Sequence, residues 1–192
     1  MGIIGKDYKF KLIRNYVSQE TLNILTNYCF IKHQNNQSIF EPSNDNFATW
    51  QYVDPIMESI MGYKLTTLEK ETGLNLIPTY TVWRAYTYGN HLPKHKDRAA
   101  CEISVTLNIG SDKPWPIFMD GKCFTLNQGD AVVYLGREVE HWREPYDGDY
   151  SFNVFMHYVN AEGPCAHWAY DKRKVFGEQT DGRQWEGQDK SK

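Results

Sequence analysis

The sequence lacks long apolar segments. Its 192 residues contain no run approaching the roughly 20 apolar residues that a membrane-spanning helix needs. The start of the chain also lacks the uninterrupted apolar core of a secretory signal, because charged residues occupy positions 6, 7, 9 and 11. We therefore expect a protein that does not cross a membrane and carries no secretory signal, and we expect it in the cytoplasm.

An excess of positive charge is absent too. Lysine and arginine number 21 against 24 aspartate and glutamate residues, which gives a net charge of −3. Proteins that bind nucleic acid in general need a broad basic surface, so this function is not expected, and neither is binding to membranes. The four cysteines lie far apart without a C-x-x-C pair, which favours reduced thiols over a disulfide framework or a zinc knot.

Aromatic side chains, by contrast, are abundant. Tyrosine, phenylalanine and tryptophan make up 15% of the chain, and many lie beside β-branched residues, a combination typical of strands. With 41% hydrophobic residues, a chain of 192 residues is long enough for one substantial core and short for two. The composition predicts a single, mainly β domain.

Two helices are predicted in the N-terminal part. Ser18 has the character of an N-cap before an apolar pattern of helical spacing, and this helix is expected to run to about Cys29. A second helical pattern follows Pro55 and ends near Gly73. The segment between them, residues 34–46, is polar and rich in turn-forming residues.

From position 76 onward the apolar pattern repeats every two residues, which predicts strands. We expect them at residues 77–88, 101–109, 117–119, 122–126, 131–135 and 151–159. Such regular spacing indicates an antiparallel sandwich or barrel with helices packed outside. One domain is then expected over residues 1–170, with helical support at about 1–75 and the barrel at about 76–160. Residues 171–192, charged and glycine-bearing, are expected to form a loosely ordered tail.

Two histidines occur in a setting that suggests a metal site. His95-Lys96-Asp97 lies between two predicted strands, and His141 follows another. The H-x-D spacing places two side chains on the same side of an extended segment. Two imidazoles and one carboxylate form the facial triad that holds non-haem Fe(II) and leaves positions open for a cosubstrate and O2. His95, Asp97 and His141 are therefore the predicted metal ligands and catalytic residues.

Other interpretations of these residues remain. The histidines can be exposed residues at strand ends and Asp97 a turn cap, since an isolated H-x-D triplet is common by chance. A zinc site built on His91 and His95 is disfavoured, because Pro93 interrupts the helix that it requires and Leu92 stands where a glutamate is needed.

In the order of its motifs the chain resembles the Fe(II)- and 2-oxoglutarate-dependent dioxygenases, in particular the prolyl 4-hydroxylase-like branch. The resemblance rests on Tyr86-Thr87-Tyr88-Gly89, on Leu92-Pro93-Lys94-His95-Lys96-Asp97, and on Gly129-Asp130-Ala131-Val132 leading to His141. It implies a double-stranded β-helix, a jelly-roll or cupin-like barrel with flanking helices. It also implies that the protein uses Fe(II), 2-oxoglutarate and O2 to hydroxylate an aliphatic C–H bond, with release of succinate and CO2.

One departure from the family concerns the residue that anchors 2-oxoglutarate. The family usually has a lysine or arginine about ten positions after the distal histidine, where residues 150–152 are tyrosine, serine and phenylalanine. A buried carboxylate needs a cationic partner, and arginine can hold it with two hydrogen bonds. Arg84 and Arg143 are equally favoured as the anchor, with Tyr86 as an additional donor by analogy with the family. His157, in an apolar strand, is expected to be a hydrogen-bonded core residue.

These residues indicate a reaction type rather than a substrate. By analogy, a peptidyl proline is the first expectation and a small amino-acid-like metabolite the second, so the partner is a peptide or a small molecule. The alternative is a non-catalytic jelly-roll module that binds a metal or ligand and has lost its cosubstrate. The polar face of one strand is expected to line the cavity and orient the metal ligands; it consists of Glu102, Ser104, Thr106 and Asn108.

Overall fold

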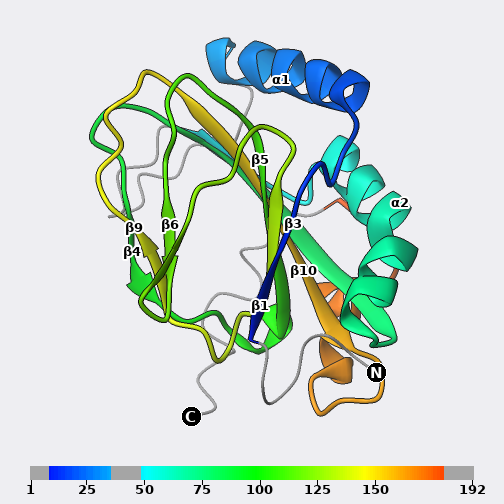
Figure 1. The fold of residues 1–192 in the computed structure, drawn as a ribbon. Coiled ribbons are helices and arrows are strands. Elements are labelled where there is room, and N and C mark those ends of the chain that lie inside the picture. The colour runs from blue at the N-terminus through cyan, green and yellow to red at the C-terminus, as the bar shows by residue number, and fades with distance from the viewer. Residues whose placement is uncertain (1–8, 36–48, 180–192) are drawn as a thin grey trace.

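Two antiparallel sheets face each other in the computed structural model, which describes residues 9–35 and 49–179 (Figure 1). From edge to edge, the larger sheet contains β1 (Phe10–Ile13), β8 (Ala131–Leu135), β5 (Ile103–Ser111), β10 (Ser151–Asn160), β3 (Leu76–Tyr86) and β2 (Thr49–Tyr52). The smaller sheet contains β4 (Leu92–His95), β9 (His141–Arg143), β6 (Ile117–Met119) and β7 (Lys122–Phe124). Together they form the predicted double-stranded β-helix.

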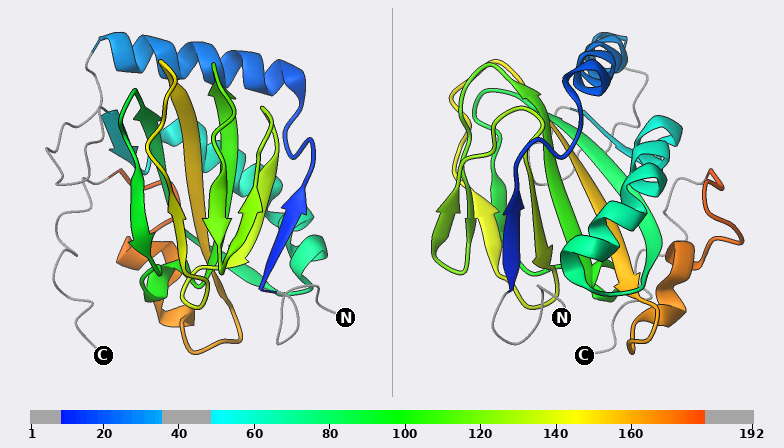
Figure 2. Two further views of the ribbon diagram at one scale, coloured as in Figure 1. Left: turned by 60° about the vertical axis from the view of Figure 1, so that its left-hand side comes forward. Right: turned by 45° about the vertical axis from the view of Figure 1, so that its right-hand side comes forward.

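Two helices pack against the larger sheet on its outer side. Helix α1 (Gln19–Gln34) begins at Ser18, whose hydroxyl accepts a backbone hydrogen bond at 3.3 Å. Helix α2 (Pro55–Thr72) begins at Asp54 and ends at Gly73, whose φ of 70° suits a left-handed cap. Figure 2 shows α1 running across the ends of the strands and α2 lying behind the sheet. In the described ranges, no helix is long and apolar enough to cross a membrane.

Side chains of the larger sheet alternate between its two faces. The apolar residues of β5 face the helices and belong to the main core; they are Ile103, Val105, Leu107 and Ile109. Ser104, Thr106 and Asn108 alternate with them and lie on the inner face, toward the smaller sheet. The inner face of β5 is therefore polar, as its sequence predicts, but Glu102 precedes the strand and accepts a hydrogen bond from the backbone amide of Asn160 at 2.9 Å.

The six predicted strands are present as β3, β5, β6, β7, β8 and β10, and both predicted helices are present. Helix α1 continues five residues beyond the predicted end at Cys29. Four further strands were not predicted. β1, β2, β4 and β9 are three or four residues long and pair with strands distant in the sequence, whereas the equally short β6 and β7 form a local hairpin. For example, β1 pairs with β8, and Phe10 lies opposite Tyr134. The N-terminal part thus adds two strands to the sheet besides its helices.

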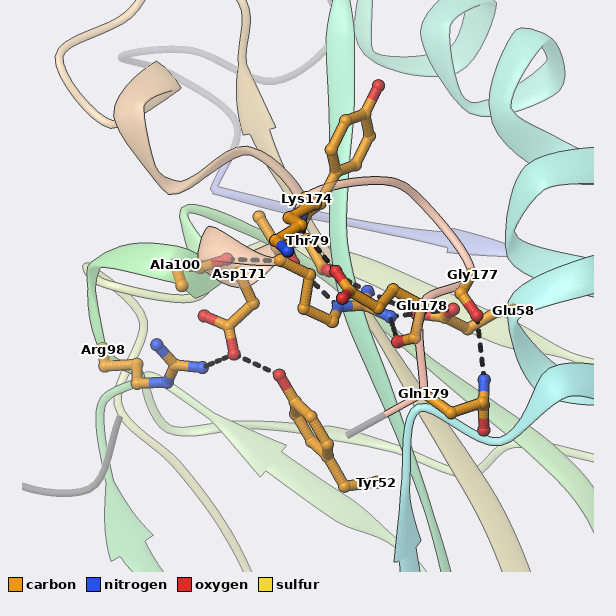
Figure 3. A network of polar contacts seen from close by, with 12 residues as sticks. Tyr52, Glu58, Thr79, Arg98, Ala100, Asp171, Lys174, Gly177, Glu178 and Gln179 are labelled. Atoms are coloured by element: carbon orange, nitrogen blue, oxygen red, sulfur yellow. Dashed lines mark hydrogen bonds and ion pairs between the residues drawn. The ribbon is translucent and has the colours of Figure 1, made fainter. Parts of the chain in front are cut away.

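The segment that follows β10 packs back onto the barrel. Near the end of the short helical segment η2 (Ala166–Lys172), Asp171 accepts hydrogen bonds from Arg98 at 2.7 Å and from Tyr52 (Figure 3). Arg173 forms a buried ion pair with Glu58 of α2 at 2.6 Å. As far as residue 179, the segment therefore differs from the loosely ordered tail expected from Asp171 onward. Residues 180–192 and most of the polar segment 34–46 lie outside the described residues.

Candidate active site

Three side chains meet where β4 and β9 lie side by side. His95 is the last residue of β4, His141 is the first of β9, and the two are paired directly across the smaller sheet. Asp97 follows in a loop that is fixed by a hydrogen bond from its amide to the carbonyl oxygen of Gly136, at 2.9 Å. The structure therefore brings together the three residues that the sequence predicts as metal ligands.

The candidate ligand atoms point at a common position. Oδ1 of Asp97 lies 3.5 Å from Nε2 of His95 and 3.7 Å from Nε2 of His141. The Nδ1 atoms are engaged elsewhere, with the carbonyl oxygen of Pro93 at 2.8 Å and that of Val139 at 3.0 Å. A carbonyl oxygen only accepts, so each Nδ1 donates its proton and each neutral imidazole keeps the Nε2 lone pair for a metal.

This set of donors suits a divalent ion such as Fe(II). One ligand atom from each residue lies within 4.8 Å of the other two. Two imidazoles and a carboxylate on one side of an ion leave the opposite side open for other ligands. The side chain of His95 is 39% exposed and that of His141 is 3% exposed, so the group lies at the boundary between the barrel interior and solvent.

Protons compete with a metal ion for the side chains of these three residues. Burial lowers the pKa of His95, but its contacts with Asp97 and Pro93 outweigh burial and leave the pKa above the ordinary 6.5. Burial dominates for His141, whose pKa is lowered. Burial raises the pKa of Asp97, yet its hydrogen bonds and the neighbouring histidines lower it overall. The proton that a metal must displace near neutral pH is therefore held mainly by His95.

Metal binding is expected to weaken as the pH falls through the raised pKa of His95. Below that pKa the affinity should fall by about tenfold per pH unit, because one proton is released for each ion bound. Above it, the affinity should be nearly constant. Titration with Co(II) at a series of pH values on both sides of neutrality measures the slope, and an affinity that is unchanged across the acidic range would contradict this coupling.

A cavity of about 120 Å³ adjoins the three residues, and its walls include Arg84, Tyr134 and His157. The hydroxyl of Tyr134 lies 3.3 Å from Nε2 of His141 and thus close to the metal position. Sequence reasoning missed Tyr134. The period-two pattern of β8 was the available signal, since it places this residue with Val132 on the inner face.

The two candidate anchors for 2-oxoglutarate occupy different places. Arg84 lines the cavity, and its guanidinium lies 5.9 Å from the centre of the Phe155 ring. Arg143 is 3% exposed, and its guanidinium lies 4.6 Å from the centre of the Trp115 ring. It donates one hydrogen bond to the carbonyl oxygen of Trp115 and another to Oδ1 of Asn153, at 3.2 Å.

The charge of Arg143 is not balanced by an acidic residue in the described part of the chain, and its Nε atom has no hydrogen-bond partner there. Burial lowers the pKa of Arg143 to about 10, with partial compensation from the phenol groups of Tyr86 and Tyr134. Tyr86 is fully buried and packs against Trp115 with 4.7 Å between ring centres. A buried guanidinium without a counter-ion is costly, so this position is suited to a bound anion.

Comparison with solved structures identifies proteins of similar fold. A Pseudomonas putida prolyl-4-hydroxylase is 16% identical, with 79% of this chain and 92% of that chain covered and a TM-score of 0.66. A Trichoplax adhaerens prolyl hydroxylase in complex with a hypoxia inducible factor peptide fragment is 11% identical, with 80% and 84% covered and a TM-score of 0.62. The carbocyclase SnoK of nogalamycin biosynthesis, which is non-heme and alpha ketoglutarate dependent, is 10% identical, with 80% of each chain covered and a TM-score of 0.63.

No family model and no curated protein matches the sequence. The likeness to solved structures is therefore a likeness of fold at low sequence identity. It confirms the predicted double-stranded β-helix, a fold that the chain shares with solved prolyl hydroxylases and with an alpha ketoglutarate dependent carbocyclase.

Proposed function

We propose that the protein is an Fe(II)- and 2-oxoglutarate-dependent dioxygenase that hydroxylates an aliphatic C–H bond. The observation that carries the proposal is the convergence of His95, Asp97 and His141 beside a cavity inside the barrel. Similarity of fold to several 2-oxoglutarate-dependent enzymes supports an oxidoreductase of this kind.

In this proposal the three residues hold Fe(II). When bound together, the metal, 2-oxoglutarate and O2 supply the oxidising chemistry, and the cosubstrate leaves as succinate and CO2. The chain contributes binding and orientation. The hydrogen bonds from Nδ1 of His95 and His141 to backbone carbonyl groups fix the planes of both rings. Leu92 and Phe155, in the cavity wall, limit the access of water.

The far carboxylate of 2-oxoglutarate is assigned to Arg143 rather than to Arg84. Arg143 follows His141 by two residues, so both side chains leave the same face of β9, about 7 Å apart along the strand. That distance suits a five-carbon diacid whose other end binds the metal. Arg143 also contacts Asn153 on β10, the strand where the family resemblance leads one to expect the basic residue. In this proposal an arginine from β9, in the opposite sheet, takes the place of that basic residue.

A second buried arginine provides the contrast that supports this assignment. Both terminal nitrogens of Arg173 bind the carboxylate of Glu58, at 2.6 and 3.0 Å, and one of them also donates to the carbonyl oxygen of Thr79. The charge of Arg173 is therefore compensated within the chain. The charge of Arg143 is left for a ligand to compensate.

The substrate is proposed to be a peptidyl proline or a small amino-acid-like metabolite. Among proteins of this fold, the Trichoplax enzyme was determined with a peptide fragment, whereas SnoK is a carbocyclase of a biosynthetic route. The exposed edge of His95 leaves the metal position accessible to either class. We propose that Arg84, which lies in the cavity wall, contacts the substrate.

Succinate release tests this function. With Fe(II), 2-oxoglutarate and O2, we expect the protein alone to release succinate slowly. Proline-containing peptides and free amino acids are then added separately, and the class that contains the substrate should increase succinate release several-fold. An Asp97→Ala variant, which lacks one ligand, should release none. Equal release by Asp97→Ala and the natural sequence would contradict the proposal.

A non-catalytic jelly-roll module is the second candidate. One observation favours it, namely that residues 150–152 contain no lysine or arginine. A protein that binds Fe(II) but neither binds nor consumes 2-oxoglutarate would support this alternative.

A further inference from the structure

A chain of hydrogen bonds leads from Asp97 into the barrel. The hydroxyl oxygen of Ser104, on β5, lies 2.9 Å from Oδ2 of Asp97 and 2.9 Å from Nδ1 of His157, on β10. Ser104 is fully buried and His157 is 6% exposed. The two residues are directly paired between neighbouring strands, so the sheet itself fixes their separation.

The direction of these hydrogen bonds follows from the single proton of the hydroxyl. Besides His157, Ser104 contacts two groups that only accept, the carboxylate of Asp97 and the carbonyl oxygen of Cys101 at 3.2 Å. The bond to the carboxylate is the shorter, and a charged acceptor makes it the stronger. If Ser104 donates to Asp97, then His157 must donate from Nδ1 to Ser104.

In this arrangement the two carboxylate oxygens of Asp97 face different groups. Oδ1 lies toward Nε2 of His95 and of His141, while Oδ2 accepts from Ser104. The side chain of Asp97 can adopt this orientation only because residue 136 is a glycine. A Cβ at position 136 would lie 2.5 Å from Oδ2 of Asp97, which is too close. A carboxylate held in this way offers one oxygen to a metal and keeps the other away from it.

We propose that Ser104 and His157 are positioning residues that hold Asp97 as a one-oxygen metal ligand, with His157 protonated at Nδ1. The inference rests on the proposed function, since it concerns the same metal. A carboxylate that bound through both oxygens would occupy one of the positions that 2-oxoglutarate and O2 require.

A second metal ion is the competing interpretation. Ligand atoms of Asp97, Cys101 and His157 also lie within 4.8 Å of one another. However, the hydroxyl of Ser104 is within hydrogen-bonding distance of both Asp97 and His157 and occupies the space between them. We therefore expect one metal ion per chain.

The state of His157 can be tested without metal, by ¹⁵N NMR of the full-length protein labelled at histidine. Long-range proton–nitrogen correlations distinguish Nδ1–H from Nε2–H, and the His157→Asn variant identifies the signal. We expect Nδ1–H in the natural sequence. A neutral His157 protonated at Nε2 would overturn the proposed direction of the hydrogen bonds.

The effect on the metal is tested by anaerobic titration with Co(II), followed through its ligand-field absorption. Ser104→Ala and His157→Leu should each weaken binding by about 10- to 100-fold and alter the absorption, which reports coordination number. His157→Asn keeps an N–H group near the position of Nδ1 and should restore both the affinity and the spectrum. Rescue of the spectrum would not be expected if His157 only filled space.

The outcomes separate the two proposals. If the natural sequence binds no Co(II), the proposed function fails. If it binds Co(II), but Ser104→Ala and His157→Leu keep its affinity and spectrum, the positioning role fails and the metal site remains. Two equivalents of Co(II), one of them lost in Cys101→Ala, would also overturn the inference in favour of a second metal.

Discussion

Replacement of Arg143 by methionine is expected to weaken 2-oxoglutarate binding strongly and to leave Fe(II) binding intact. Removing one partner of a buried charged contact costs about 2–5 kcal/mol, which corresponds to a dissociation constant raised roughly 30- to 4,000-fold. Methionine retains much of the side-chain volume and removes a buried charge, so the fold should tolerate it. Anaerobic titration of the Fe(II)-loaded protein with 2-oxoglutarate measures the loss.

The matched control is Arg84→Met, the same replacement in the cavity wall. It should leave the affinity for 2-oxoglutarate close to that of the natural sequence, because Arg84 is assigned to the substrate side of the cavity. If Arg84→Met loses 2-oxoglutarate while Arg143→Met retains it, the two assignments must be exchanged.

Replacement of Arg173 by methionine is expected to lower the free energy of unfolding by about 3–5 kcal/mol. The reason is that Glu58, which is 2% exposed, would remain buried without its only ion-pair partner among the described residues. The segment that follows η2 should detach from α2 and β3 at the same time. Urea denaturation followed by circular dichroism measures the change.

Two further variants give this measurement its controls. Lys9→Met removes an exposed ion pair with Asp120, in which the side chain of Lys9 is 45% exposed and that of Asp120 is 32% exposed. This replacement should lower the free energy of unfolding by less than about 1 kcal/mol. The double variant Glu58→Leu/Arg173→Met removes both buried charges and should recover most of the lost stability. A loss in Arg173→Met no larger than that in Lys9→Met would contradict the structural role of the buried pair.

The part of the site that the sequence predicts is the part governed by local spacing. His95 and Asp97 share a face because they are two residues apart at a strand end, and the alternating pattern of β5 correctly places Ser104 inside the barrel. In both cases a short stretch of chain decides the position. The pairing of His95 with His141 is different, because it joins β4 and β9, two short strands that were not predicted.

The features that the sequence does not predict are the burial of individual side chains and their contacts with residues distant in the sequence. Arg84 and Arg143 have equivalent strand positions, and only the folded barrel separates a cavity wall from a buried site. Arg173 lies in a charged segment typical of a loose tail, yet its partner Glu58 is 115 positions away. Charged side chains at such separations carry no local signal of burial, so the ion pair could not be predicted.

The central claim is that His95, Asp97 and His141 hold Fe(II) with positions left open for 2-oxoglutarate. The anaerobic absorption spectrum recorded during addition of Fe(II) and 2-oxoglutarate tests it most directly. We predict a metal-to-ligand charge-transfer band that saturates at one Fe(II) per chain and is absent in Asp97→Ala. A natural sequence that gives no band at saturating concentrations, or a band that persists unchanged in Asp97→Ala, would contradict the account.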